Sequence, residues 1–177
     1  KKIGLLYSKS EDSSKAPIED AKKFLADKGV EVVEKTGTTT DEVNQAVDAL
    51  IAEKVDAIFT PTDNTIQKAE LSFYEKLQKA KIPHYGGADS FALNGAFAGY
   101  GVDYVQLGKA TADMVDEVLH GGKETATLPV QTFDNGIATV NTDTAEKLGF
   151  SMDELKEVFK PYCTKVEEIK TNQEFAK

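Results

Sequence analysis

Apolar and polar positions alternate along the chain in a pattern that predicts strands and helices in turn. Four apolar runs are too short for helices and are typical of buried strands: residues 3–7, 30–33, 55–59 and 82–85. Between them, apolar residues recur at spacings of three and four, which indicates amphipathic helices over residues 18–25, 43–51 and 66–80. Strands that alternate with helices form parallel βαβ units. The pattern therefore predicts a three-layer α/β fold of flavodoxin-like or Rossmann-like order, with a mostly parallel sheet and helices on both faces.

The segment after residue 95 has a different character. Residues 96–104 are small and aromatic, and a helical spacing of apolar residues follows over residues 105–119. Asp103 and Gln106 have the spacing of a capping box for this helix. Asp103 is thus either a helix cap, which we favour, or an acceptor for a cationic ligand group.

Short elements are predicted to close the sheet. Two strands over residues 128–133 and 136–140 flank a turn at 134–136, and Ser151 with Glu154 has the spacing of another capping box. The predicted organisation has four parts: a main lobe at residues 1–95, a strand and helix at 96–122, closing strands and short helices at 123–160, and a polar tail at 161–177.

The first candidate binding site follows the third predicted strand. Thr62, Asp63, Asn64 and Thr65 stand together where that strand ends and the next helix begins. In an open α/β sheet, ligands bind beyond the carboxyl ends of the strands, where helices present free N–H groups. One such residue is enough to cap a helix. Four in a row favour a ligand-binding role over capping alone.

Polar residues also follow the first and fourth predicted strands. Glu11, Ser13 and Ser14 follow the first, and either serine could cap the next helix or help to hold a small anion. Asp89 and Ser90 follow the fourth, after two glycines that suit either a plain turn or a close approach to a ligand. Because parallel strands end at one edge of a sheet, we expect these groups to lie close together.

Composition excludes several classes of function. The formal net charge of −9 opposes binding to a polyanion, so we expect no nucleic-acid partner. All 21 basic residues are lysine, so an anion must be held by hydroxyls, helix N–H groups or a lysine. Enzyme motifs are absent, and His84, His120 and Cys163 have no partners at a useful spacing. We therefore expect no catalytic residue, no metal ligand and no cofactor.

Several blocks of sequence together resemble the solute-binding proteins of ABC importers with the type I periplasmic-binding fold, in the branch associated with tryptophan and tyrosine uptake. The resemblance runs from about Ile3 to Phe159. The blocks are YSKSEDSS (7–14), VDAIFTPTDNT (55–65), KIPHYGGADSF (81–91), GVDYVQLGKATADMVDEVLHG (101–121), LPVQT (128–132) and VNTDTAEKLG (140–149).

The resemblance implies binding without chemistry. In such proteins two lobes close over a ligand, here an amino acid, and the complex docks on a membrane permease. It places the three polar groups on the cleft, with Asp63 and Asp89 as candidates for the ligand ammonium group. The candidates for its carboxylate are Ser13, Ser14 and Thr65. Tyr85, Phe91, Tyr100 and Tyr104 could stack on an aromatic ligand, although aromatic residues at such places more often belong to a core.

The resemblance also implies a location and a missing partner. Family members are extracytoplasmic, as cell-surface lipoproteins or periplasmic proteins, and are nearly twice as long as this chain. We therefore expect the sequence to be the carboxy-terminal lobe alone, with residues 96–122 deprived of the first lobe and able to form a homodimer. Two alternatives stay open: a receiver or enzyme of flavodoxin type, for which Glu11, Asp12 and Asp63 offer the acidic residues, and a ligand-sensing domain of a signalling protein.

Overall fold

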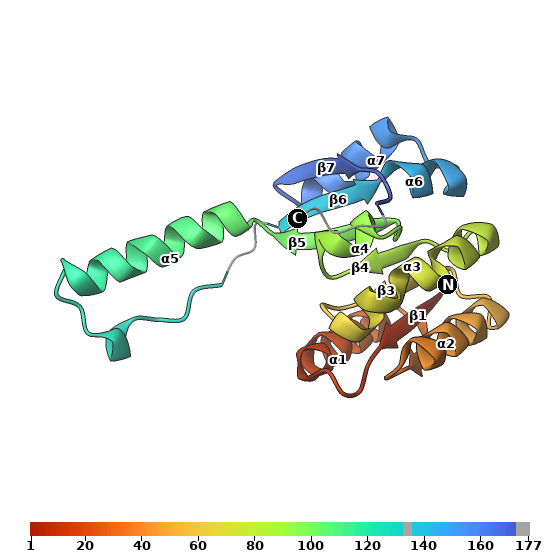
Figure 1. Cartoon of the computed structure of the whole chain (residues 1–177), viewed down its shortest axis with the longest axis horizontal. Coiled ribbons are helices and arrows are strands. Elements are labelled where there is room, and N and C mark those ends of the chain that lie inside the picture. Colours follow the sequence, from red (N-terminus) through yellow and green to blue (C-terminus); the bar gives the residue numbers. More distant parts are fainter. Residues whose placement is uncertain (133–135, 173–177) are drawn as a thin grey trace.

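A computed structural model describes residues 1–132 and 136–172, which form a seven-stranded sheet in the order β2-β1-β3-β4-β5-β6-β7 (Figure 1). Neighbouring strands in these residues are parallel except β5 and β6, which are antiparallel. The strands are β1 (Lys2–Tyr7), β2 (Glu31–Thr36), β3 (Ala57–Thr60), β4 (His84–Gly86), β5 (Ala98–Val102), β6 (Gly136–Asn141) and β7 (Lys165–Ile169). The predicted mostly parallel α/β sheet is confirmed.

Helices cover both faces of this sheet. The α-helices are α1 (Asp12–Asp27), α2 (Thr40–Ala52), α3 (Asn64–Ala80), α4 (Asp89–Leu93), α5 (Tyr104–Leu119), α6 (Thr142–Leu148) and α7 (Met152–Phe159). Two short 3₁₀ helices, η1 (Thr125–Thr127) and η2 (Lys160–Tyr162), complete the described elements. Helices α2 and α3 pack on one face, while α1 and the end of α7 flank the strands on the other.

The main core lies between the sheet and helices α2 and α3. Its members include Leu6 and Ile58 from the strands, and Val47, Ile66 and Phe73 from the helices. These helical residues are the ones that the spacing of three and four placed on a common face, because burial of apolar area drives an amphipathic helix onto a sheet. A second cluster around Phe97, Val140 and Leu155 joins β5 and β6 to α7.

Two predicted segments at the carboxyl end were wrong. Residues 128–132 form no strand in the structure, and the rest of the predicted hairpin strand and turn, at 133–135, lies outside the described residues. The second predicted strand, at residues 136–140, is confirmed as β6, which pairs antiparallel with β5 and closes the sheet. The segment that we expected to be a polar tail instead contributes β7, which pairs with β6 at the sheet edge. An edge strand tolerates charged residues, which explains why its sequence, KVEEI, gave so weak a strand signal.

Helix caps divide into predictions that held and predictions that failed. Asp103 caps α5, since its Oδ1 accepts hydrogen bonds from the backbone N–H groups of Val105 and Gln106 at 3.0 Å. Ser151 makes no capping hydrogen bond at α7. The serines at 13 and 14 are not caps either, because α1 begins at Asp12 and both lie inside its first turn.

Helix α5 stands apart from the rest of the chain. Figure 1 shows it leaving the end of β5 and extending away from the sheet, with the segment that contains η1 running back beside it. None of its 16 residues is buried by the part of the chain that the structure describes. The strand before it, β5, is integral to the sheet and runs between β4 and β6.

Candidate functional site

The loops that follow β1, β3, β4 and β5 meet at one edge of the sheet, because these four strands are parallel. We call this edge the crest and define it as residues 8–14, 61–65, 87–90 and 103. All ten residues predicted from the sequence to bind ligand lie on it. The structure now shows which of them touch one another.

Asp63 is the centre of the crest, and it is buried with a relative exposure of 1%. Its Oδ2 accepts hydrogen bonds from the backbone N–H of Ser8 at 2.7 Å and from the hydroxyl of Ser14 at 2.6 Å. Its Oδ1 accepts from the N–H of Ile66 at 3.0 Å and so caps α3. One carboxylate thus ties the end of β1, the start of α1 and the start of α3 together.

The burial of Asp63 and Ser14 changes what each can do. Both side chains are enclosed and satisfy one another, so they form the framework of the crest. The accessible polar groups around them are those of Ser13, Thr62 and Asn64, which are exposed. The predicted ligand contacts of Asp63 and Ser14 stay untested, and their geometry gives them a structural task instead.

A second set of contacts joins the loop after β1 to α3. The carboxylate of Glu11 accepts hydrogen bonds from Thr65 Oγ1 at 3.2 Å and from Asn64 Nδ2 at 3.4 Å. Next to it, the hydroxyl of Ser13 donates to the backbone carbonyl of Thr62 at 3.0 Å. The first and second predicted groups therefore form a single polar surface, as expected from their place at one edge of the sheet.

The fourth strand joins this surface through a glycine. Thr62 donates its hydroxyl proton to the carbonyl oxygen of Gly87 at 2.9 Å. A Cβ at Gly87 would lie 2.5 Å from the backbone nitrogen of Thr62, so only glycine permits this approach. The contact brings the loops after β3 and β4 side by side.

The outer part of the crest carries two further carboxylates. Asp89 is exposed at the start of α4, and its Oδ1 accepts a hydrogen bond from the N–H of Ser90 at 2.8 Å. Asp89 and Asp103 together line a small pocket of about 140 Å³, beside Thr139 and Glu167. At the first residue of α1, hydrogen bonding to Lys15 lowers the pKa of the exposed Asp12 below its ordinary value. The accessible surface of the crest is thus rich in acidic groups.

An apolar cavity of about 510 Å³ reaches the crest from the face of the sheet between α1 and α7. Its aromatic lining comes from Phe59, Tyr85, Tyr100, Phe159 and Tyr162. The sequence predicted aromatic contacts for Tyr85 and Tyr100 but missed the other three. The strand alternation could have placed Phe59, because successive side chains of a strand point to opposite faces. Ile58 points into the main core, so Phe59 points to the other face, where the cavity lies.

The other two predicted aromatic contacts lie elsewhere. Phe91 is buried beneath the crest, with its ring edge-on to His84 at a centroid distance of 5.8 Å. Tyr104 stands on α5 and is 69% exposed. Phe91 therefore packs in the core, as aromatic residues at strand ends commonly do.

The described residues contain no group of three or more His, Cys, Asp or Glu side chains arranged to hold a metal ion. Among the same residues, no helix has both the length and the apolar character needed to cross a membrane. His84 is buried between Thr60 and Glu70, and His120 caps the exposed end of α5, so each histidine has a local structural partner.

Comparison with known proteins decides the class of protein. The family described as ABC transporter substrate binding protein matches residues 1–160. The chain belongs to this family. Members of the family bind substrates and are not enzymes, and the buried, fully engaged Asp63 also argues against a phosphorylated receiver.

Individual members of the family are also similar to the chain. The tyrosine-binding protein of Clostridioides difficile (strain R20291) is 35% identical over 148 residues, which are 84% of this chain and 42% of that protein. A ligand-free, open substrate-binding protein with adhesive properties from Clostridium difficile is 31% identical with a TM-score of 0.79, over 97% of this chain and 55% of the other. A protein from Streptococcus pneumonia, solved in complex with L-Trp, is 33% identical with a TM-score of 0.74, over 94% and 55%.

The fold of these relatives is the type I periplasmic-binding fold, as the sequence predicted. This chain spans about half the length of the relatives that it matches. Tyrosine and L-Trp are the ligands named for two of these relatives.

Proposed function

We propose that this chain is one lobe of the extracytoplasmic solute-binding component of an ABC importer, and that its crest holds the polar end of an aromatic amino acid. The observation that carries the proposal is the joining of three strand-end loops into one polar surface by Asp63, Glu11 and Thr62. The names of two relatives, one tyrosine-binding and one solved with L-Trp, support this class of ligand.

The accessible groups on the crest match the two charges of an amino acid. Asp89 is the exposed carboxylate of the two that we predicted for the ammonium group, and its free oxygen can accept from it. Near the start of α1, which has no side-chain cap among the described residues, the helix N–H groups favour a carboxylate. The hydroxyls of Ser13 and Thr65 lie beside it, and on binding each exchanges its present acceptor, Thr62 O or Glu11, for the ligand carboxylate. Asp63 and Ser14 hold this arrangement from below.

The other half of the relatives' length supplies the rest of the clamp in this proposal. Residues 96–122 include α5, whose apolar residues Val105, Val115 and Leu119 are all exposed. We expected the whole of residues 96–122 to return into a first lobe, but β5 belongs to the sheet of this lobe, so only α5 and the residues after it do so in this proposal. The first lobe covers α5 and closes over the ligand, and the closed complex docks on a permease. In the chain by itself, the same apolar stripe supports self-association through residues 96–122. The protein is located outside the cytoplasm, as a lipoprotein or a periplasmic protein.

Nuclear magnetic resonance titration tests the ligand class. We expect millimolar L-tyrosine and L-tryptophan to shift the amide signals of the crest, and L-glutamate to leave them unchanged. Asp89→Asn should weaken binding about tenfold, the loss of roughly 1.4 kcal/mol of charge-assisted contact. Asp153→Asn, on the exposed start of α7, is the matched control and should bind as the parent chain does. Unchanged crest signals with both aromatic amino acids would remove them as ligands of this lobe.

A further inference from the structure

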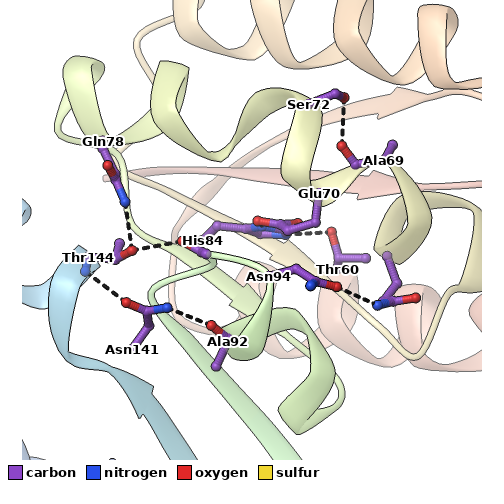
Figure 2. A network of polar contacts seen from close by, with 12 residues as sticks. Thr60, Ala69, Glu70, Ser72, Gln78, His84, Ala92, Asn94, Asn141 and Thr144 are labelled. Carbon is purple, nitrogen blue, oxygen red and sulfur yellow. Dashed lines mark hydrogen bonds and ion pairs between the residues drawn. The ribbon is translucent and has the colours of Figure 1, made fainter. Parts of the chain in front are cut away.

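Directly beneath the crest, three side chains form a hydrogen-bonded row, and none of the three is a proposed ligand contact. The hydroxyl of Thr60 lies 2.9 Å from His84 Nε2, and His84 Nδ1 lies 3.0 Å from Glu70 Oε1 (Figure 2). All three residues are at most 2% exposed. The rings of Phe73 and Phe91 pack against the imidazole at 5.8 Å, so the row is closed to solvent on its sides.

The far end of this row is an orphaned oxygen. Glu70 Oε2 is buried and has no hydrogen-bond partner among the residues that the structure describes. The narrow void beside Glu70 is too small to hold a water molecule. Residues from α3, β4, α6 and the segment just before β5 line this void, and His84 and Tyr74 are the titratable groups among them besides Glu70 itself.

The orphaned oxygen distinguishes between two charge states of Glu70. In an ionised carboxylate, His84 can pair with Oε1, but Oε2 would still carry half of the negative charge with no donor, and burial of charge without a partner is expensive. In a neutral acid, the proton can lie on Oε1 and point at His84 Nδ1, which leaves Oε2 as an uncharged carbonyl oxygen. An unpaired carbonyl oxygen is much the cheaper of the two. Burial accordingly raises the pKa of Glu70, and the neighbouring His84 opposes the rise.

The row connects the three elements that carry the crest. Thr60 is the last residue of β3 and immediately precedes Pro61 and Thr62. His84 is in β4, two residues before Gly86 and its crest neighbour Gly87. Glu70 stands on α3, whose first residues belong to the crest. Movement of any one of the three side chains therefore shifts a part of the candidate site.

We propose that Glu70 is held as a neutral acid at pH 7, and that with His84 it acts as a positioning residue that fixes the ends of β3, β4 and α3 in register under the crest. The neutral state of Glu70 fixes the proton arrangement in this proposal. Glu70 Oε1–H donates to His84 Nδ1, and His84 Nε2–H donates to Thr60 Oγ1. Loss of the Glu70 proton to solvent leaves Oε1 able only to accept, so the His84 proton must move from Nε2 to Nδ1 and Thr60 must donate to Nε2. Both bonds reverse direction, and we expect this rearrangement to loosen the register. The effect on ligand affinity rests on the proposed function, whereas the charge state and the register do not.

The sign of the pH dependence follows from the direction of the pKa shift. Because the folded-state pKa of Glu70 is raised, its contribution to stability is fully present below the unfolded pKa, which is about 4.3 for glutamate. The contribution is lost as the pH rises from there through the folded-state pKa. We expect the unfolding free energy of the parent chain, relative to that of Glu70→Gln, to fall over this range.

Infrared spectroscopy of the full chain at pH 7 tests the charge state. We expect a carbonyl band of a protonated carboxylic acid in the parent chain, its loss in Glu70→Gln, and its retention in Glu75→Gln, which changes an exposed glutamate of the same helix. The absence of a protonated carboxyl band from the parent chain would overturn the proposal, whether or not the variant folds.

Amide signals of Gly86 and Gly87 test the positioning role without any ligand. As the pH is raised above 7, where the proposal has Glu70 release its proton, we expect both signals to shift in the parent chain and in Glu75→Gln. The shift should be absent from Glu70→Gln. Signals that titrate equally in all three chains, or in none of them, would show that Glu70 does not position the crest. If the register shifts and aromatic amino acids still do not bind, the proposed function fails while this inference stands.

Discussion

Helices α3 and α5 are alike along the sequence and opposite in their surroundings. Each follows the end of a strand, each is amphipathic, and each has an aspartate cap, Asp63 for α3 and Asp103 for α5. Their lengths are 17 and 16 residues. Yet α3 buries five residues, which include Phe73 and Glu70, and α5 has none buried by the described chain.

The comparison separates the properties that a helix's own sequence determines from those that its neighbours determine. A cap and an apolar stripe are local properties, so both helices have them. Burial requires a second surface, which the sheet provides for α3. Val115 and Leu119 of α5 are 51% and 69% exposed. An exposed apolar stripe of this kind is typical of an interaction surface, which is the role proposed above for α5.

The largest expected difference between the helices concerns their apolar residues. Phe73→Ala should lower the free energy of unfolding by about 3–5 kcal/mol, since it removes a ring that is 1% exposed from the main core. Val115→Ala should change it by less than about 0.5 kcal/mol, because nothing in the described chain buries that side chain. Urea denaturation measures both. Equal losses from the two variants would mean that α5 packs against the body in solution.

Replacing the two caps should give a smaller difference in unfolding free energy, again with the greater loss at α3. Asp63→Asn should cost about 2–3 kcal/mol, because a neutral amide cannot accept equally well from Ser8, Ser14 and Ile66 in a buried place. Asp103→Asn should cost under about 1 kcal/mol, since asparagine is as good a helix cap as aspartate. The same denaturation experiment applies. A loss at position 63 no greater than that at 103 would contradict the framework role of Asp63.

The smallest expected effect concerns association of the chain with itself. We expect a weak dimer at high concentration, and Leu119→Lys should raise its dissociation constant about tenfold by placing a charge on the exposed stripe of α5. Val158→Lys alters an equally apolar exposed residue on α7 and should leave association unchanged. Sedimentation equilibrium measures the constant. A parent chain that stays monomeric at the highest attainable concentration would rule out the dimer.

Much of the fold could be predicted because its signals are local. The apolar runs placed the first four strands to within a few residues, and the spacing of three and four placed α2 and α3 on the sheet. The strand β7 was missed because its residues are largely charged. Its place beside β6 depends on pairing with a strand far away in the sequence, which no short window contains.

The candidate site was predicted as a set of residues but not as a structure. Sequence order placed Asp63 and Ser14 at strand ends, and it could not show that the two residues hold one another beneath the surface. The row from Thr60 to Glu70 was also invisible, because His84 has no polar partner close to it in the sequence. Contacts between distant segments arise only from the assembled sheet.

The antiparallel pairing of β5 and β6 has one more consequence. Val102 pairs with Gly136, so the chain leaves the sheet and re-enters it at neighbouring positions. The segment between them is an insertion whose two ends lie on neighbouring strands. A tight turn could replace it without changing the strand order. The segment can therefore be lengthened, exchanged or deleted while the strand order and the parts of the crest at residues 8–14, 61–65 and 87–90 are kept, and only Asp103 is lost from the crest.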